Sequence, residues 1–281
     1  MNVTILGASG FIGKHLAAAL TARGDRVTTA SLRDPSVAAG AAREADVVVN
    51  LAGEPVAQRW SASVKEKIRS SRVEGPHAFL DALGALERRP AAYVSASAIG
   101  YYGTSESATF DESSAPGSDF LAGVCVAWEA EAERAAALGM RVSVVRTGLV
   151  LGADGGALAK LLPLFKAGLG GIVASGRQWY SWIHIDDQVG VYLHAIDGAA
   201  GVLNATAPNP VRNAEFTRAL GAALHRPTLF PAPAFAVQLV LGEGAGVVTD
   251  GQKVVPTRTL ETGYAFRYPA LDAALAAIVS G

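Results

Sequence analysis

Short apolar runs alternate with segments of helical periodicity through the first half of the chain. Strand-like runs occupy 2–6, 26–31, 46–53, part of 91–103, and 141–152. Between them, apolar residues recur every three to four positions, which predicts helices over 10–24, 38–45, 61–86 and 127–139. Strands that are apolar throughout and separated by helices indicate a parallel sheet covered on both faces.

After Gly152 the pattern changes. A helix flanked by glycine-rich loops is expected in 153–171, a short strand and a helix in 181–196, and a strand in 201–208. Helices and proline-rich loops follow to the C-terminus. We therefore predict an α/β fold, a doubly wound parallel sheet of the Rossmann type with a smaller C-terminal α/β lobe. Residues 1–152 and about 181–206 would form the cofactor domain, and about 153–180 and 207–281 the substrate-side lobe.

Composition narrows the class of protein. The 281 residues are 50% hydrophobic, which is enough to form a large core. The formal net charge of −1 does not favour nucleic acid or an anionic membrane as a partner, although a local charged patch could still bind one. One cysteine excludes an internal disulfide and a cysteine-based zinc site, and fits a reducing compartment. No targeting segment or membrane span is evident. We expect a cytoplasmic protein, monomer or homodimer, that acts on a small molecule.

The first turn carries the clearest chemistry. Three glycines, at 7, 10 and 13, stand between the first strand and the first helix. In a dinucleotide-binding turn they give the tight bend, the close approach of a pyrophosphate, and close packing of helix on strand. The helix N-terminus then offers free N–H groups to the phosphates. The expected cofactor contacts are Gly7, Ser9, Gly10, Phe11, Ile12 and Gly13.

The end of the second strand predicts which nucleotide binds. NAD sites usually place an acidic residue there for the ribose 2′-hydroxyl, whereas this chain has Ser31 and then Arg33. A hydroxyl and a guanidinium suit a 2′-phosphate, which favours NADP over NAD. Asp34 as the ribose ligand, or Arg33 as a solvated loop residue, are the alternatives.

Further contacts are expected beyond the third strand. Small residues close that strand, so the cofactor can pass over the backbone there. The next helix carries charges that are solvated by default, although Arg72 could reach the cofactor. The expected contacts here are Leu51, Ala52, Gly53, Glu66 and Arg72.

Taken together, several segments resemble one family. The chain is similar to extended short-chain dehydrogenases/reductases of the NAD-dependent epimerase/dehydratase type, in GASGFIG, NLAG, VSASAIGYYG, VVRTGLVLG and SWIHIDD. It resembles more narrowly an epimerase-like subgroup, through NLAGEPVAQRW, DFLAGVCVAWE and GQKVVPTRTLETGYAFRYP. The resemblance implies hydride transfer with NAD(P), using a Ser or Thr after the fourth strand and a helical Tyr with a Lys four residues later.

The family's acid–base pair is missing from this chain. Ser97 matches the family serine, and Ser95 on the same strand is expected near the cofactor. The positions of the Tyr and Lys, however, are occupied by apolar or thiol residues, namely Phe120 or Leu121 and Val124 or Cys125. Neither combination can replace a Tyr–Lys pair.

Several side chains are candidates to replace that pair. Tyr101 and Tyr102 follow Ser97 on one loop. Cys125 could act as a thiol acid, although a lone cysteine on an apolar helix is more often a core residue. His184 titrates in a useful range, or else ties the returning strand to the cofactor domain together with Asp186. No metal site is expected.

The remaining signals lie near the ligand edge of the sheet. Arg146 ends the fifth strand and would meet either the cofactor, an anionic substrate group or the pocket wall. Paired glycines on both sides of the helix in 153–171 suit a mobile cover or ordinary turns. The sequence thus predicts an NADP(H)-binding oxidoreductase or epimerase-like enzyme. A non-catalytic NADP(H)-dependent sensor is the alternative.

Overall fold

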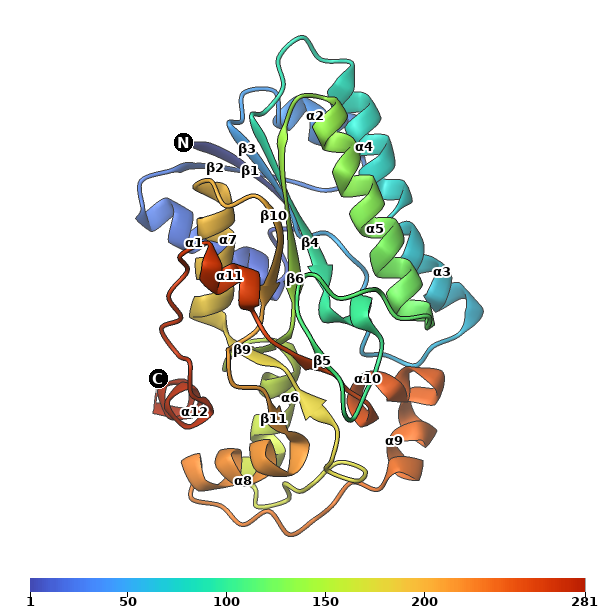
Figure 1. The fold of residues 1–281 in the computed structure, drawn as a ribbon, viewed down its shortest axis with the longest axis vertical. Coiled ribbons are helices and arrows are strands. Elements are labelled where there is room, and N and C mark those ends of the chain that lie inside the picture. Colours follow the sequence, from blue (N-terminus) through green and yellow to red (C-terminus); the bar gives the residue numbers. More distant parts are fainter. Residues whose placement is uncertain (281) are drawn as a thin grey trace.

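Six parallel strands form the central sheet of the computed structural model, which describes residues 1–280 (Figure 1). The order across the sheet is β10-β6-β4-β3-β1-β2. Their bounds are Asn2–Leu6 for β1, Arg26–Ala30 for β2, Val47–Asn50 for β3, Ala92–Ala98 for β4, Arg141–Thr147 for β6 and Gly201–Ala205 for β10. The order reverses between β1 and β3, and ligands of open α/β sheets bind at the carboxyl ends of the strands beside such a reversal.

Helices cover both faces of this sheet, which confirms the α/β prediction. On one face lie α1 (Phe11–Ala22) and α7 (Ile185–Ile196), and on the other α2 (Pro35–Ala41), α4 (Glu74–Gly84) and α5 (Phe120–Ala137) (Figure 1). Alternate residues of each strand enter two separate cores. In β3, for example, Val49 packs toward α1 and α7, whereas Val48 packs toward α2 and α4. Burial on both faces explains why β3 is a continuous run of valines.

The C-terminal part builds a third core of its own. It is formed mainly by α6 (Gly156–Lys166), α8 (Asn213–Ala223) and α12 (Leu271–Ser280), with Phe165 and Phe216 among its buried side chains. Three short strand pairs lie in and beside this part, and the last of them joins the C-terminal segment to the loop after β4. They are β7 (Leu149–Leu151) with β9 (Trp182–His184), β8 (Trp179–Tyr180) with β11 (Val211–Arg212), and β5 (Thr109–Phe110) with β12 (Lys253–Val254).

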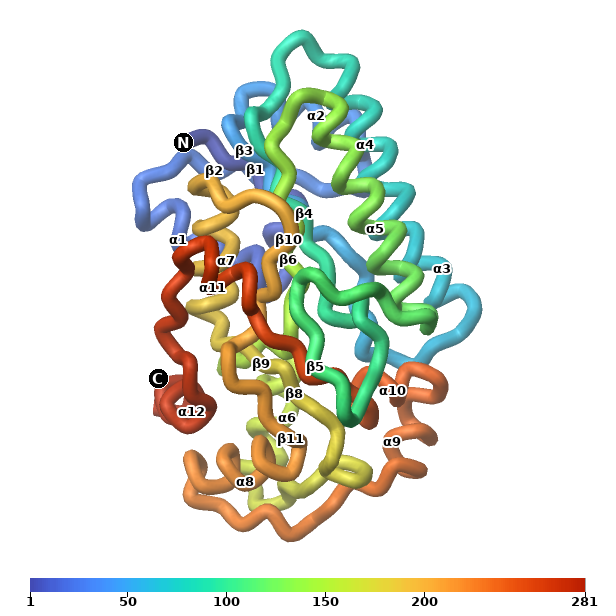
Figure 2. The backbone as a smooth tube through the Cα atoms, in the orientation of Figure 1, coloured from blue at the N-terminus to red at the C-terminus, as the bar shows by residue number. Residues whose placement is uncertain are grey.

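The last fifty residues run back over the molecule. Figure 2 shows them passing from α9 (Ala234–Leu241) and α10 (Gly246–Thr249) beside β5 to α11 (Thr257–Glu261), and then returning to α12. Asp187 fixes this return, because its buried carboxylate accepts hydrogen bonds from the Tyr264 hydroxyl and from the backbone N–H groups of Arg267 and Tyr268 at 2.7–3.0 Å.

Two predicted elements are wrong in detail. The single helix expected over 61–86 is two helices, α3 (Ala62–Ser70) and α4, because the chain bends at 71–73 and Pro76 stands in the first turn of α4, where a proline is tolerated. The strand expected over 141–152 divides at Gly148 into β6 and β7. A Cβ at Gly148 would lie 2.4 Å from the Ser181 carbonyl oxygen, so the chain between β8 and β9 passes too closely for any side chain.

Candidate functional site

The glycine turn after β1 is shaped by two close approaches of backbone. Gly7 has φ +84°, and a Cβ there would lie 2.8 Å from the Ala52 nitrogen; a Cβ at Gly13 would lie 2.6 Å from the Gly7 carbonyl oxygen. Gly10 differs, because its backbone is extended and only the Gly7 oxygen comes within 4 Å, at 3.4 Å. Gly7 and Gly13 therefore hold the turn together, whereas Gly10 leaves one face of it open.

Free amide groups face that open side. The first backbone hydrogen bond of α1 runs from the Lys14 N–H to the Gly10 carbonyl at 3.0 Å, so the N–H groups of Phe11, Ile12 and Gly13 precede the helical ladder. No side chain caps the helix, and Ser9 is exposed in the turn. Three amides at the positive end of a 12-residue helix form an anion site of the kind a pyrophosphate occupies.

The side chain of Phe11 points away from the turn and into the smaller lobe's first loop. Cβ atoms added at Gly152, Gly155 and Gly156 would each lie within 3.3 Å of the Phe11 ring. The absence of side chains at these three glycines thus leaves room for the ring of Phe11, the first residue of α1. This contact explains why positions 152, 155 and 156 are glycines. The sequence associated these glycines with either a mobile cover or ordinary turns.

The turn after β3 lies directly against the glycine turn. The Leu51 N–H donates to the Leu6 carbonyl at 2.8 Å, and a Cβ at Gly53 would lie 3.0 Å from the Arg72 guanidinium. Arg72 donates to the Glu54 carbonyl at 2.9 Å and stacks 4.9 Å from the Trp128 ring centroid. Burial lowers the pKa of Arg72. The structure therefore brings Leu51, Ala52, Gly53 and Arg72 together beside the anion site. Glu66 faces solvent on α3.

At the end of β2, the predicted nucleotide-selecting residues are accessible. Ser31 and Arg33 are both exposed, and the Ser31 hydroxyl accepts a hydrogen bond from the Arg33 N–H at 3.3 Å. The neighbouring Asp34 caps α2 by accepting from the Val37 N–H at 3.0 Å. One carboxylate oxygen of Asp34, the alternative ribose ligand, is therefore used to cap α2. The exposed guanidinium of Arg33 suits a phosphate.

A buried polar network joins Ser97 to α5, the helix that carries the positions of the family's acid–base pair. The Ser97 hydroxyl donates to Glu129 on α5 at 2.6 Å, and Arg146 donates to both oxygens of the same carboxylate at 2.8 and 2.7 Å. Arg146 also donates to the Tyr102 hydroxyl at 3.0 Å, which in turn donates to the Asn204 side-chain oxygen at 2.7 Å. These five bonds join three strands (β4, β6 and β10), the helix α5 and the loop that follows β4.

The candidate hydroxyls in this network are closed off from solvent. Ser97 is 2% exposed and Tyr102 3% exposed, and the protons of both are already donated. Burial raises the pKa of Tyr102 to about 12. Tyr101 differs, because it is half-buried and its ring lies 3.4 Å from the Arg146 guanidinium. Among the hydroxyl candidates, Tyr101 is the most accessible.

The remaining sequence candidates lie apart from this network or inside the core. His184 caps α7 by accepting from the Asp186 N–H at 3.0 Å, its ring packs 4.0 Å from that of Tyr268, and burial lowers its pKa. Ser95 is buried on β4. Within residues 1–280, no cluster of three or more His, Cys, Asp or Glu side chains is arranged to hold a metal ion.

Cys125 behaves as a core residue. Its side chain is buried, and burial raises its pKa to about 11. We therefore expect the thiol to react with 5,5′-dithiobis(2-nitrobenzoate) at mildly alkaline pH on the order of hundredfold more slowly in the native protein than after unfolding in guanidinium, because thiolate and access are both needed. The single cysteine makes the absorbance of released thionitrobenzoate unambiguous. Comparable rates in both states would mean that the helix opens readily.

Three residues of the site region were not predicted from the sequence. Asn50 ends β3 and donates to the buried Tyr93 hydroxyl at 3.0 Å, while Glu129 and Asn204 belong to the polar network. Of these, Glu129 had a local signal in the sequence. Glu129 lies one turn from Cys125 and Ala132 on the buried side of α5, and a lone acid on such a face implies a partner.

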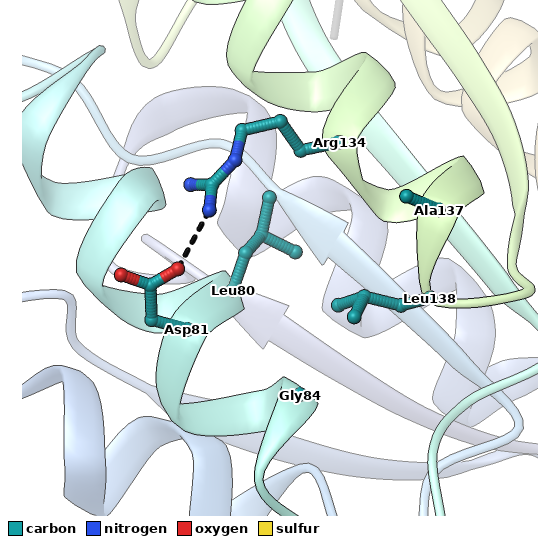
Figure 3. A pocket seen from close by; sticks show the side chains of 6 residues that line it. All are labelled: Leu80, Asp81, Gly84, Arg134, Ala137 and Leu138. Carbon is teal, nitrogen blue, oxygen red and sulfur yellow. Dashed lines mark hydrogen bonds and ion pairs between the residues drawn. The ribbon is translucent and has the colours of Figure 1, made fainter.

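A surface pocket elsewhere is unrelated to this chemistry. It lies between the C-terminal ends of α4 and α5 and is crossed by the Arg134–Asp81 ion pair of 2.6 Å (Figure 3). Those helix ends lead into the starts of β4 and β6, so the pocket lies at the opposite edge of the sheet from the glycine turn.

Two family models and several known proteins match this chain. The model of the NAD-dependent epimerase/dehydratase family matches residues 3–205, and that of a domain of unknown function, DUF1731, matches 232–278. The chloroplastic SDR39U1 homologue of Arabidopsis thaliana, an epimerase family protein, is 43% identical over 302 residues, which span 99% of this chain and 87% of the relative.

Solved structures agree with this match. The human epimerase family protein SDR39U1, crystallised with NADPH, has a TM-score of 0.92 at 36% identity and is covered completely in both chains. A UDP-glucose 4-epimerase of Thermus thermophilus in complex with NAD has a TM-score of 0.81 at 18% identity, with 100% of this chain and 98% of that chain covered, which supports the fold alone.

Proposed function

Because the chain belongs to the NAD-dependent epimerase/dehydratase family, with a C-terminal DUF1731 segment, we propose that it binds NADP(H) and acts as an atypical oxidoreductase or epimerase on a small molecule. The observation that carries this proposal is the open glycine turn, where three amides at the start of α1 precede the helical ladder and no side chain caps the helix. When bound, the nicotinamide supplies a hydride donor or acceptor.

The residues of the ligand edge fit the parts of such a dinucleotide. The amides at 11–13 would hold the pyrophosphate. The 51–53 turn and Arg72 would border it, and Ser31 with Arg33 would hold the 2′-phosphate. The NADPH in the human SDR39U1 crystal structure supports this assignment. The polar network of Ser97, Glu129 and Arg146 would lie behind the nicotinamide, with Tyr101 at its accessible side.

The smaller lobe is proposed to bind the substrate. Residues 153–180 and 207–281 would form it, against a cofactor domain of 1–152 and 181–206. The separate core of α6, α8 and α12 supports this division. Residues 1–280 contain no helix with the length and apolarity to cross a bilayer. The near-zero net charge and single cysteine favour a small-molecule substrate and a reducing compartment such as the cytoplasm.

A non-catalytic NADP(H)-dependent sensor is the second candidate. It is favoured by one observation, the burial of the Ser97 and Tyr102 hydroxyls with their protons already donated. The two functions are separated by assaying protein stripped of nucleotide. An enzyme oxidises or reduces some member of a panel of carbonyls, sugars and quinones, and its rate responds to Ser97→Ala. A sensor binds NADPH without turnover.

Calorimetry with NADPH and NADH tests the shared premise. Measurable binding of NADPH, tighter than that of NADH at physiological salt, is the expected result. The proposal fails if the stripped protein binds neither nucleotide.

Arg33→Ala is expected to weaken NADPH binding about thirtyfold, because a charge-assisted pair with a phosphate contributes about 2 kcal/mol, and to leave NADH binding unchanged. Arg43→Ala, an exposed arginine beyond α2, is the matched control. Calorimetry of all three proteins with both nucleotides measures the effect. Equal losses for NADPH and NADH would assign Arg33 to another role.

A further inference from the structure

One end of the smaller lobe exposes an unusual number of large apolar side chains. Their exposed fractions run from 50% to 74%. The set, here called the apolar face, consists of Leu164, Leu169, Leu229, Phe230, Phe235, Leu239 and Val240. Three of them belong to α9, whose eight residues AFAVQLVL include no charge and none that is buried. A helix whose exposed side chains are apolar apart from one glutamine indicates a contact outside the chain.

Backbone hydrogen bonds hold the members of this face side by side. The Leu169 N–H donates to the Leu164 carbonyl at 2.9 Å, and the Phe230 N–H donates to the Gly170 carbonyl at 3.2 Å. The Ala232 N–H then donates to the Ile172 carbonyl at 2.9 Å, two residues before α9 begins. The loop after α6 and the segment leading into α9 therefore lie side by side, at the lower end of the molecule in Figure 1.

The same segments are cationic, although the chain as a whole has a net charge of −1. Residues 155–185 and 216–242 contain no Asp or Glu. They contain Lys160, Lys166, Arg177, Arg218 and Arg226. Within residues 1–280, only Arg177 of these five forms an ion pair with an acidic side chain, Glu106. The Arg226 guanidinium donates to the Lys166 carbonyl at 2.9 Å, which brings two cationic residues together beside Leu164 and Leu169.

We propose that the apolar face docks on an anionic lipid surface. Exposed Phe and Leu side chains enter the interface between headgroups and acyl chains, while flanking Lys and Arg pair with lipid phosphates. The positive charge disfavours a second copy on the same face, because an isologous contact would bring like charges together. This attachment is peripheral, adds to the proposed cofactor chemistry and does not depend on it.

Vesicle sedimentation of the full chain tests the proposal. Binding to vesicles of phosphatidylcholine with phosphatidylglycerol is expected, with little binding to phosphatidylcholine alone and a decrease at high salt. The double variant Phe235→Asp, Leu239→Asp should reduce the bound fraction at least about tenfold, because two charges would enter the interface. Val37→Asp on α2, an equally exposed apolar residue outside this face, should bind normally.

A second variant tests the charge by itself. Lys166→Glu with Arg218→Glu should weaken binding to the anionic vesicles with the apolar residues intact, and circular dichroism checks the fold of every variant. Three results would overturn the proposal: no sedimentation with anionic vesicles, equal binding by the Asp double variant, or light scattering that shows a dimer which the Asp double variant dissociates. The last would assign the face to self-association.

Discussion

Replacing Gly10 by Asp is expected to abolish measurable NADPH binding, a loss of at least about a hundredfold, while the protein stays folded. The carboxylate would stand in front of the amides of 11–13, where it both fills the phosphate site and repels the phosphates. Gly10 is suited to this test because its backbone is extended and a Cβ there meets a single atom at 3.4 Å. Calorimetry gives the affinity, and thermal unfolding checks the fold.

The choice of glycine decides whether this experiment is informative. Gly10→Ala is the matched control, because it adds the Cβ without the charge and should retain most of the binding. Gly13→Ala would be uninformative, since its Cβ would lie 2.6 Å from the Gly7 oxygen and the turn itself would have to move. Undiminished NADPH affinity in Gly10→Asp would show that the cofactor, if bound, does not use this turn.

The largest effect on stability is expected from Glu129→Ala, which should lower the free energy of unfolding by about 3–5 kcal/mol. Glu129 is the partner of both Arg146 and Ser97, and the side chains of the ion pair are only 4% and 12% exposed. Truncation leaves a guanidinium buried without its counter-charge. Urea unfolding followed by tryptophan fluorescence measures the change.

Two further variants separate the loss of the ion pair from a general effect of mutating α5. Glu133→Ala, on the exposed side of the same helix, should change stability by less than about 0.5 kcal/mol. Combining Glu129→Leu with Arg146→Met should recover much of the stability, because no charge then remains buried. A cost below about 1 kcal/mol for Glu129→Ala would mean that water reaches Arg146.

The sequence predicted what depends on short stretches of chain. The glycine turn is local, since strand, bend and helix start lie within thirteen residues, so spacing alone specified its shape. The apolar strands and intervening helices gave the sheet and its two covered faces. Errors arose where a segment distant in sequence determines where an element ends. At Gly148, for example, the close approach of Ser181 divides a strand that the apolar pattern predicts as continuous.

The polar network shows the same limit more sharply. Ser97, Tyr102 and Arg146 were each selected from the sequence, but separately, the first two as candidates for catalysis and Arg146 as a contact of the cofactor or substrate. Their actual partners, Glu129 and Asn204, lie as much as 102 residues away in sequence, and no local spacing rule identifies either one as their partner. Sequence periodicity can reveal that Glu129 faces a core, yet only the fold shows which cation neutralises it.

The way Asn204 is held also constrains the order of events during synthesis. Its side-chain amide donates to the Val255 carbonyl at 3.0 Å, and its own carbonyl accepts from the Thr259 hydroxyl at 3.0 Å. A nascent chain that has emerged only as far as β10 therefore has all six sheet strands but leaves these groups unmatched. These hydrogen bonds at the ligand edge can form only after Val255 and Thr259 have emerged from the ribosome. A chain truncated after β10 is therefore expected to need chaperones.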